Sequence, residues 1–180
     1  MLVAPGRPTD FVVRAPSSRA AVPGQPAMRV REPEDANARL AAAFAHADLG
    51  DLETAARETA EVLAAHPLSA PARYLLGVIR REQGATSAAA SEFRRTLYID
   101  RDFVLAHFAL AGLHRQAGEY AAAAREYEST LRALSKDTGG DWTDFLGGFT
   151  PELLVQSCER GLEECRSAAV AAKGAPRTRR

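Results

Sequence analysis

Residues 36–69 read ANARLAAAFAHADLGDLETAARETAEVLAAHPLS, and two further copies of this pattern follow, APARYLLGVIRREQGATSAAASEFRRTLYIDRDF over 70–103 and VLAHFALAGLHRQAGEYAAAAREYESTLRALSKD over 104–137. Three positions carry the same kind of residue in every copy, at intervals of 34 residues. They are a glycine (Gly50, Gly84, Gly118), a small residue seven positions earlier (Ala43, Gly77, Ala111) and an alanine five positions later (Ala55, Ala89, Ala123). A fixed period of this length with small residues at fixed phases is typical of stacked helical hairpins.

Each copy predicts two helices joined at its glycine. In the third copy, for example, Ala106, Leu110 and Leu113 fall on one face of the first helix. The glycines Gly50, Gly84 and Gly118 are expected to adopt the left-handed conformation that ends one helix and starts the next. We therefore expect helices over 36–48 and 52–65, over 70–83 and 86–99, and over 104–117 and 120–134.

The segment before the repeats has a different composition. Residues 1–35 contain six of the ten prolines of the chain, so this segment predicts a linker without regular helix. A β-prone run, Phe11-Val12-Val13, allows a short strand over 10–14. Two interpretations are open for it: an apolar patch in a disordered tail, or the last strand of a domain outside this sequence.

The segment after the repeats predicts a loop and then a single helix. Residues 138–150 are rich in glycine and predict a loop whose aromatic residues Trp142, Phe145 and Phe149 anchor it. Thr150-Pro151-Glu152 suits a helix start, with threonine as N-cap and proline in the first turn. An apolar stripe then predicts a capping helix over 151–172, formed by Leu154, Cys158, Leu162 and Cys165. Residues 173–180 predict a basic disordered tail.

Charge and composition narrow the class of partner. The chain has 23 basic and 23 acidic residues and a sequence pI of about 6.9, so no net charge draws it to nucleic acid or to anionic lipid. We expect no nucleic-acid partner and no membrane insertion, since no run is long enough to span a bilayer. The two cysteines do not indicate a disulfide framework, and we expect a cytoplasmic protein.

The repeated pattern resembles the tetratricopeptide repeat (TPR), with three copies over 36–137. The resemblance rests on the glycines, the small residues and alanines, and the aromatic residues Phe93 and Tyr127. It implies an all-α solenoid of three helical hairpins whose function is protein–protein interaction. The sequence departs from the family where a bulky residue is usual early in the first helix, and has Arg39, Arg73 and His107 instead.

A narrower resemblance covers roughly 36–165. The segments Tyr98–Leu110 and Gly148–Leu154 are similar to runs in the TPR region that follows the catalytic domain of CheR-type chemoreceptor glutamate methyltransferases. The resemblance implies an accessory or regulatory module of a chemotaxis-type signalling system, with a protein or peptide partner. Nothing in this sequence matches a site for S-adenosylmethionine, because no glycine-rich turn follows a strand. The alternatives are a fragment of such a methyltransferase and a TPR adaptor unrelated to chemosensing.

No pattern predicts catalysis, a cofactor or a metal site. His46, His107 and His114 with Cys158 and Cys165 do not form a cluster at zinc-ligand spacing. We expect these histidines at the solvent edge or between helices, and the cysteines in the core. Serines lie on the predicted helices without a neighbouring base and acid, so no catalytic residues are predicted.

The best candidate site is the concave face, which the first helices of such hairpins line. The positions that point there combine aromatic and apolar residues with arginines, the types that are enriched at binding hot spots. The alternative is that the aromatic residues pack between neighbouring helices. The predicted partner-binding residues are Leu40, Phe44, Tyr74, Val78, Arg81, Phe108 and Arg115.

Overall fold

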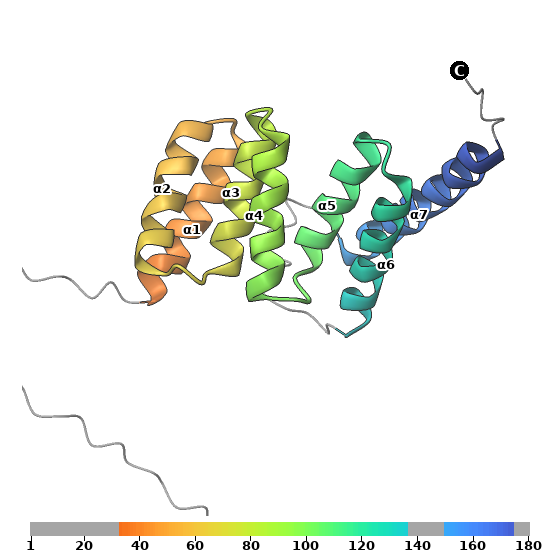
Figure 1. Ribbon diagram of the computed structural model, residues 1–180. Helices are drawn as coiled ribbons and strands as arrows, with labels where there is room; N and C mark the ends of the chain where they lie inside the picture. The colour runs from red at the N-terminus through yellow and green to blue at the C-terminus, as the bar shows by residue number, and fades with distance from the viewer. Residues whose placement is uncertain (1–32, 137–149, 175–180) are drawn as a thin grey trace, which may run out of the picture. The chain divides into compact units, whose positions relative to one another are not determined.

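A computed structural model describes residues 33–136 and 150–174, all of which belong to one unit, Arg31–Arg180. This part of the chain is entirely α-helical, as the sequence predicts, and forms seven helices (Figure 1). They are α1 (Pro33–Asp48), α2 (Leu52–Ala65), α3 (Ala70–Glu82), α4 (Thr86–Ile99), α5 (Val104–Gln116), α6 (Tyr120–Lys136) and α7 (Pro151–Gly174).

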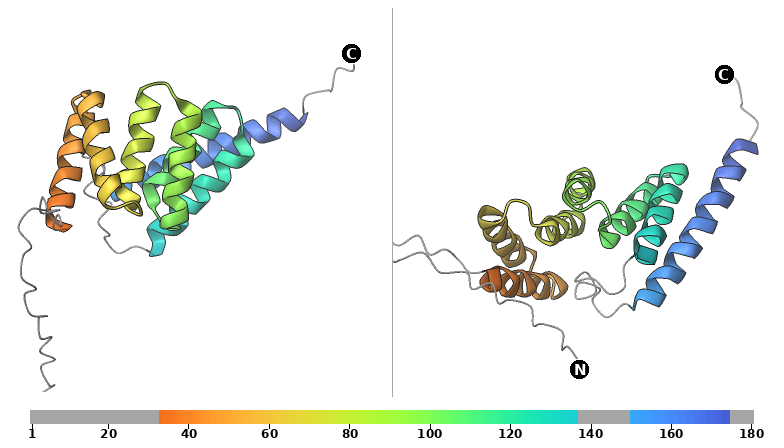
Figure 2. Two further views of the ribbon diagram at one scale, coloured as in Figure 1. Left: turned by 60° about the vertical axis from the view of Figure 1, so that its left-hand side comes forward. Right: turned by 90° about the horizontal axis from the view of Figure 1, so that it is seen from below.

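The helices pair in sequence order, so the fold is a stack of three hairpins with one further helix. The pairs α1–α2, α3–α4 and α5–α6 form the hairpins, and each hairpin packs against the next through α2–α3 and α4–α5. Figure 2 shows α1 to α6 following one another side by side, with α7 beside α6. Helix α7 covers the side of α6 that a fourth hairpin would otherwise cover, as a capping helix does.

The glycine turns have a specific backbone requirement. Gly50, Gly84 and Gly118 have φ angles of +81°, +78° and +75°, in the left-handed region where a side chain is strained. At each turn the amide nitrogen of the following residue, such as Ala85, donates a hydrogen bond back to a carbonyl of the preceding helix, here that of Arg80 at 2.9 Å. The glycines therefore close one helix and allow the chain to reverse into the next.

Two other glycines permit close contact with an aromatic ring. A Cβ atom on Gly77 would lie 2.5 Å from the Phe93 ring, so only glycine lets α3 and α4 approach this closely. A Cβ atom on Gly161 would likewise lie 2.5 Å from Cζ of Tyr127, which brings α7 against α6. Because Phe93 and Tyr127 are buried, these small-residue contacts set the spacing between the helices.

The residues that depart from the TPR pattern link the two helices of each hairpin. The Arg73 Nη1 atom lies 3.4 Å from Oε2 of Glu92, and the His107 Nδ1 atom lies 2.7 Å from Oε2 of Glu126. In the first hairpin Arg39 pairs with Glu61. A basic residue on the first helix therefore pairs with a carboxylate on the second in all three hairpins.

The last helix begins and packs as its sequence predicts. The Leu153 backbone N–H donates to Oγ1 of Thr150 at 3.3 Å, so Thr150 caps α7. Cys158 and Cys165 are free and fully buried in the core that α7 shares with α5 and α6. Burial raises the pKa of the Cys158 thiol to about 12, so this cysteine behaves as a small apolar residue.

Helix α1 begins at Pro33, so the predicted linker over 1–35 is wrong for its last three residues. Proline suits the first turn of a helix because its φ is already helical and its missing N–H is not needed there. Helix α7 likewise extends to Gly174, two residues beyond the prediction. Three predictions lie outside the described residues: the rest of the linker with the strand over 10–14, the aromatic residues of the loop over 138–150, and most of the tail over 173–180.

None of the helices over 33–136 and 150–174 is long and apolar enough to cross a bilayer.

Candidate functional site

The candidate site is a hollow of about 370 Å³ bordered by α3, α5, α6 and α7. Four of the predicted binding residues line it together, Tyr74 and Arg81 from α3 and Phe108 and Arg115 from α5. The structure therefore brings together both predicted aromatic–arginine pairs. Gly112 also lines the hollow, and a Cβ atom there would have open space around it.

The aromatic side chains of the hollow belong to two groups of contacting rings. The Tyr74 ring centroid lies 5.4 Å from that of Phe103 and 5.7 Å from that of Phe93, both buried. The Phe108 and Tyr127 rings meet nearly edge to face, with centroids 6.1 Å apart. These separations lie in the favourable range for aromatic pairs, so contacts with neighbouring rings fix the positions of Tyr74 and Phe108.

Tyr74 forms an apolar wall that remains uncharged. Burial raises its pKa to about 12, while Arg81 opposes the shift and Asp48 adds to it. The phenol is therefore protonated at physiological pH and offers a hydrogen-bond donor at the edge of an apolar surface. An apolar side chain of a partner can contact the ring without meeting a charge.

The two arginines lie at the rim and are only weakly engaged. The Arg81 Nη2 atom lies 2.9 Å from Oε1 of Glu82, and the Arg115 Nη1 atom lies 2.9 Å from Oε2 of Glu164 on α7. The side chains of all four residues are 42–51% exposed. Exposed pairs of this kind contribute only about 0–1 kcal/mol, so each guanidinium can exchange its partner for an incoming carboxylate.

The other predicted binding residues do not line this hollow. Phe44 stacks on Tyr74 at a centroid distance of 6.4 Å, and Val78 packs against the core beneath. Leu40 is 5% exposed and belongs to the core of the first hairpin. It borders a separate hollow of about 490 Å³, which also involves Val62 and Leu68.

The lining residues of the hollow that were not predicted are five residues of α5 and two from other helices; those of α5 are Leu105, Ala109, Gly112, Leu113 and Gln116. Tyr127 from α6 and Leu154 from α7 both line it, although neither lies on a first helix of a hairpin. The repeat pattern marks Tyr127 as an aromatic position of the second helix, and its ring also packs in the core. Leu154 reaches the hollow only because of the angle at which α7 lies, which no periodic pattern predicts.

The histidines lie between or beside helices, as expected. His107 is the most enclosed of the three, with Nδ1 2.7 Å from Glu126 and Nε2 3.0 Å from the carbonyl oxygen of Arg101. The Nδ1 atom of His114 lies 2.5 Å from Oε2 of Glu119, beside the third turn. Among the residues described, no three histidine, cysteine or acidic side chains are grouped as a metal site requires.

Comparison with solved structures identifies the architecture. The chain is similar to PcrH, solved in complex with the chaperone binding region of PopD, with a TM-score of 0.65 and 16% identity over 79% of this chain and 98% of that one. It is also similar to the TPR domain of Sgt2 from Aspergillus fumigatus, with a TM-score of 0.60 and 18% identity over 87% and 93% of the two chains. The fold is a TPR stack.

A third solved structure of the same kind is a T3SS complex from Aeromonas hydrophila, with a TM-score of 0.63 and 16% identity over 77% of this chain and 85% of that one. Identities this low establish the TPR fold and nothing more specific. No protein-family model matches the chain, and no curated protein matches it in sequence.

Proposed function

We propose that this protein is a peptide-binding module that recognises its partner through the hollow between α3 and α5. The observation that carries the proposal is the pairing of an apolar aromatic wall with two loosely held arginines in one cavity. A volume of about 370 Å³ falls within the range of roughly 300–1,000 Å³ that ligand sites occupy. Binding without a chemical step by this chain is the function that this arrangement favours.

The chemistry of the hollow specifies the ligand. An apolar side chain fits against Tyr74, Phe108 and Leu154, and a carboxylate near it can replace Glu82 on Arg81 or Glu164 on Arg115. We therefore expect a segment in which apolar and acidic residues alternate at short spacing. PcrH, which has the same fold, was solved with a segment of another protein, and this supports a peptide rather than a small molecule as ligand.

Two arginines also provide orientation. A guanidinium can hold a carboxylate through two parallel N–H bonds, so each arginine selects both charge and direction. Arg81 and Arg115 lie on different helices at the same rim, which lets two acidic groups of one segment be engaged at once. The apolar contact then buries an apolar side chain of the segment, and the arginines determine how the segment is aligned in the hollow.

Selection from a displayed library of random peptides tests the proposal and does not require the natural partner. The immobilised protein should enrich peptides that combine apolar and acidic residues, and the variant Arg81→Glu/Arg115→Glu should not retain them. The control is Arg57→Glu/Arg125→Glu, which makes the same change in charge at two exposed positions outside the hollow. Equal retention by both variants would rule out the arginines as the recognition element.

We also propose that the cellular context is a chemosensory pathway in the cytoplasm, in which the protein assists a CheR-type methyltransferase. The support is the similarity of Tyr98–Leu110 and Gly148–Leu154 to the TPR region of those enzymes. In a reconstituted assay with such a methyltransferase and its receptor, the chain should change the rate of methyl transfer to receptor glutamates. An unchanged rate, together with peptide binding at the hollow, would assign it as an adaptor outside chemosensing.

A further inference from the structure

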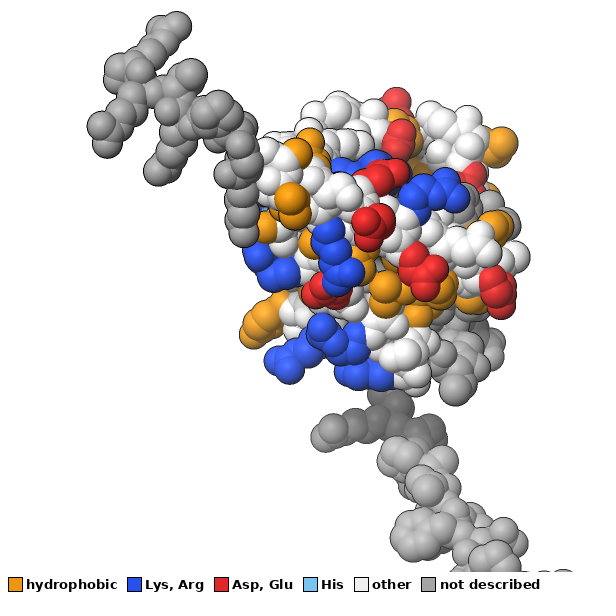
Figure 3. Space-filling model, turned by 90° about the vertical axis from the view of Figure 1, so that its right-hand side faces the viewer, with side chains coloured by type: hydrophobic (Ala, Val, Ile, Leu, Met, Phe, Trp, Pro, Cys, Tyr) orange, Lys and Arg blue, Asp and Glu red, His pale blue; other side chains and the backbone are white. Residues whose placement is uncertain are grey.

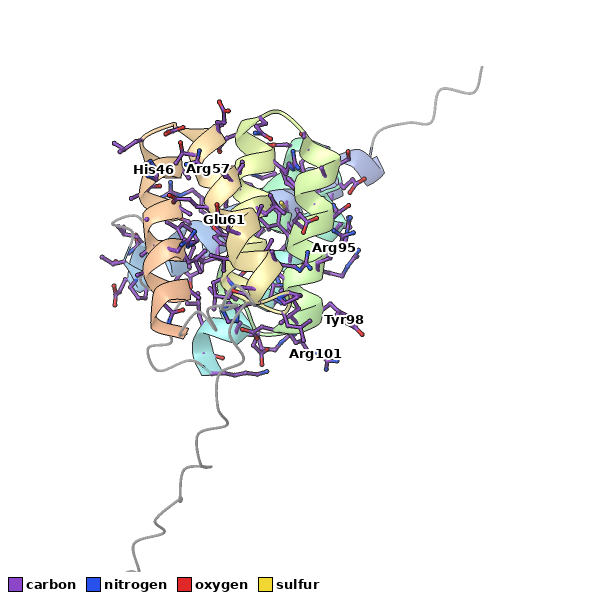
Figure 4. All side chains as sticks on the ribbon, turned by 90° about the vertical axis from the view of Figure 1, so that its left-hand side faces the viewer. His46, Arg57, Glu61, Arg95, Tyr98 and Arg101 are labelled. Atoms are coloured by element: carbon purple, nitrogen blue, oxygen red, sulfur yellow. The ribbon has the colours of Figure 1, made fainter. Side chains whose placement is uncertain are left out.

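The outer face of α4 carries exposed basic and aromatic side chains. Arg94, Arg95 and Tyr98 lie on the side opposite the buried Phe93, and Tyr98 is 90% exposed. Figure 4 shows Arg95 and Tyr98 projecting from α4 away from the other helices, with Arg101 beyond its end. We refer to Arg94, Arg95, Tyr98 and Arg101 as the α4 surface.

Most of the charge on the α4 surface is uncompensated. Arg95 pairs with Glu92 at 2.6 Å, but Arg94 and the Arg101 side chain make no ion pair with any residue that the structure describes. Asp102 lies nearby, and both of its carboxylate oxygens accept from Nζ of Lys136 at 3.0 and 3.1 Å. The surface therefore has an excess of positive charge around an exposed tyrosine, the composition of an interface hot spot.

The outer face of α7 carries the complementary charge. Glu152, Glu159 and Glu163 fall on one side of this helix, opposite the buried Cys158 and Cys165. Within the described parts of the chain, Glu159 and Glu163 have no ion-pair partner, and Glu163 only accepts a 3.5 Å hydrogen bond from Ser167. We refer to the three glutamates as the α7 surface.

The α7 surface also resembles the α4 surface in having an exposed apolar group. Val170, on the same side of the helix, is 71% exposed. Figure 3, which faces the side where α7 lies in Figure 1, shows acidic side chains among basic ones on this part of the molecule. The exposed basic residues of this helix include Arg160, next to Glu159, and Arg166, which is paired with Glu128 of α6 at 3.0 Å. Arg160 therefore reduces the acidic excess of the α7 surface but does not remove it.

We infer that the α4 surface of one molecule binds the α7 surface of a second copy of the same chain. The two surfaces have opposite charge, each lies on one helix, and each presents an exposed large hydrophobic residue, Tyr98 or Val170. They belong to different parts of the stack, so the contact is head to tail: one molecule keeps its α7 surface free and the other keeps its α4 surface free. Such a contact forms rings or open chains of molecules rather than a closed pair. The hollow between α3 and α5 takes no part in it.

Sedimentation velocity of the purified protein tests this inference. At an ionic strength of about 0.02 M the weight-average sedimentation coefficient should rise with protein concentration, and at about 0.5 M it should remain that of the monomer, because salt screens exposed charges. The variants Arg94→Glu/Arg95→Glu and Glu159→Lys/Glu163→Lys should each remain monomeric at low salt. The control Arg57→Glu/Arg125→Glu should associate as the parent does.

A mixing experiment tests whether the charges of the two surfaces complement each other. The first variant has two acidic surfaces and the second has two basic surfaces, so an equimolar mixture should associate although neither variant does alone. Circular dichroism checks that each variant is folded. A parent that remains monomeric at low salt, or variants that associate alone as strongly as the parent, would overturn the inference.

Discussion

Replacing Gly77 by alanine tests whether the close contact between α3 and α4 positions the wall of the hollow. The new methyl group would lie 2.5 and 2.7 Å from two atoms of the Phe93 ring. Phe93 is fully buried and its ring packs against Tyr74, so it cannot move aside without displacing Tyr74 as well. We therefore expect a loss of stability and a disturbed hollow.

The magnitude follows from comparison with a second helical glycine. Alanine gains about 1 kcal/mol over glycine in a helix interior, and overpacking a core costs about 1–3 kcal/mol. Gly112 of α5 has nothing within 4 Å of its Cβ position, so Gly112→Ala should show the gain alone. The two variants should therefore differ by about 1–3 kcal/mol in free energy of unfolding, or roughly 2–12 °C in melting temperature.

Urea unfolding followed by circular dichroism measures this difference, and Phe93→Leu in both backgrounds identifies its cause. With the smaller side chain at position 93, the difference between the two alanine variants should fall to nearly zero. Equal stabilisation by Gly77→Ala and Gly112→Ala with Phe93 in place would refute the reasoning, since the methyl group would then have found room.

Three further predictions concern other parts of the stack. Gly84→Val should lower the free energy of unfolding by about 1–2 kcal/mol. The cause is backbone strain at φ +78° and not a steric clash, because no atom lies within 4 Å of the Cβ position. The folded fraction should still bind peptide, and an unchanged melting temperature would contradict the prediction. Burial alone would lower the pKa of His107, but hydrogen bonds to Glu126 and to the Arg101 carbonyl, with the charges of Glu126 and Asp102, raise it overall. Because its pKa is raised on folding, protonated His107 stabilises the folded state below the unfolded pKa, and this contribution is lost as the pH rises through the folded pKa. His107→Gln should therefore be more destabilising at about pH 5.5 than at about pH 9, as measured by urea unfolding. Cys158 and Cys165 should resist iodoacetamide in the native protein and react after denaturation, because both are buried and burial raises the pKa of each thiol; labelling of the native protein at the rate of a free thiol would contradict their core position.

The helices and turns are predictable because the constraints that produce them are local and repeat. A glycine with positive φ every 34 residues marks each turn, and an apolar stripe such as Leu154–Cys158–Leu162 marks the buried side of a helix. The same period also relates the interhelical pairs. His107 and Arg73 lie 34 residues apart, as do their partners Glu126 and Glu92, so a cation and a carboxylate at fixed phases of the repeat are a signal for these pairs.

The candidate site is predictable only in part, because it depends on how elements meet. Tyr74 and Phe108 share the hollow as expected from residues that occupy the same position in consecutive repeats. Leu40 occupies that position in the first repeat and yet belongs to the core that α1 and α2 share with α3. Leu154 enters the hollow through the angle of α7, which has no counterpart in the repeat.

The central claim is that the hollow binds a segment of mixed apolar and acidic character through Arg81 and Arg115. The most direct measurement is a fluorescence-anisotropy titration of a peptide obtained by the display selection, with the parent, Arg81→Glu/Arg115→Glu and Arg57→Glu/Arg125→Glu. Loss of a hydrogen bond to a charged group costs about 1.5–3 kcal/mol, so reversal of both arginines should weaken binding about a hundredfold or more. The control should bind as the parent does. Equal Kd values for all three proteins would contradict the claim.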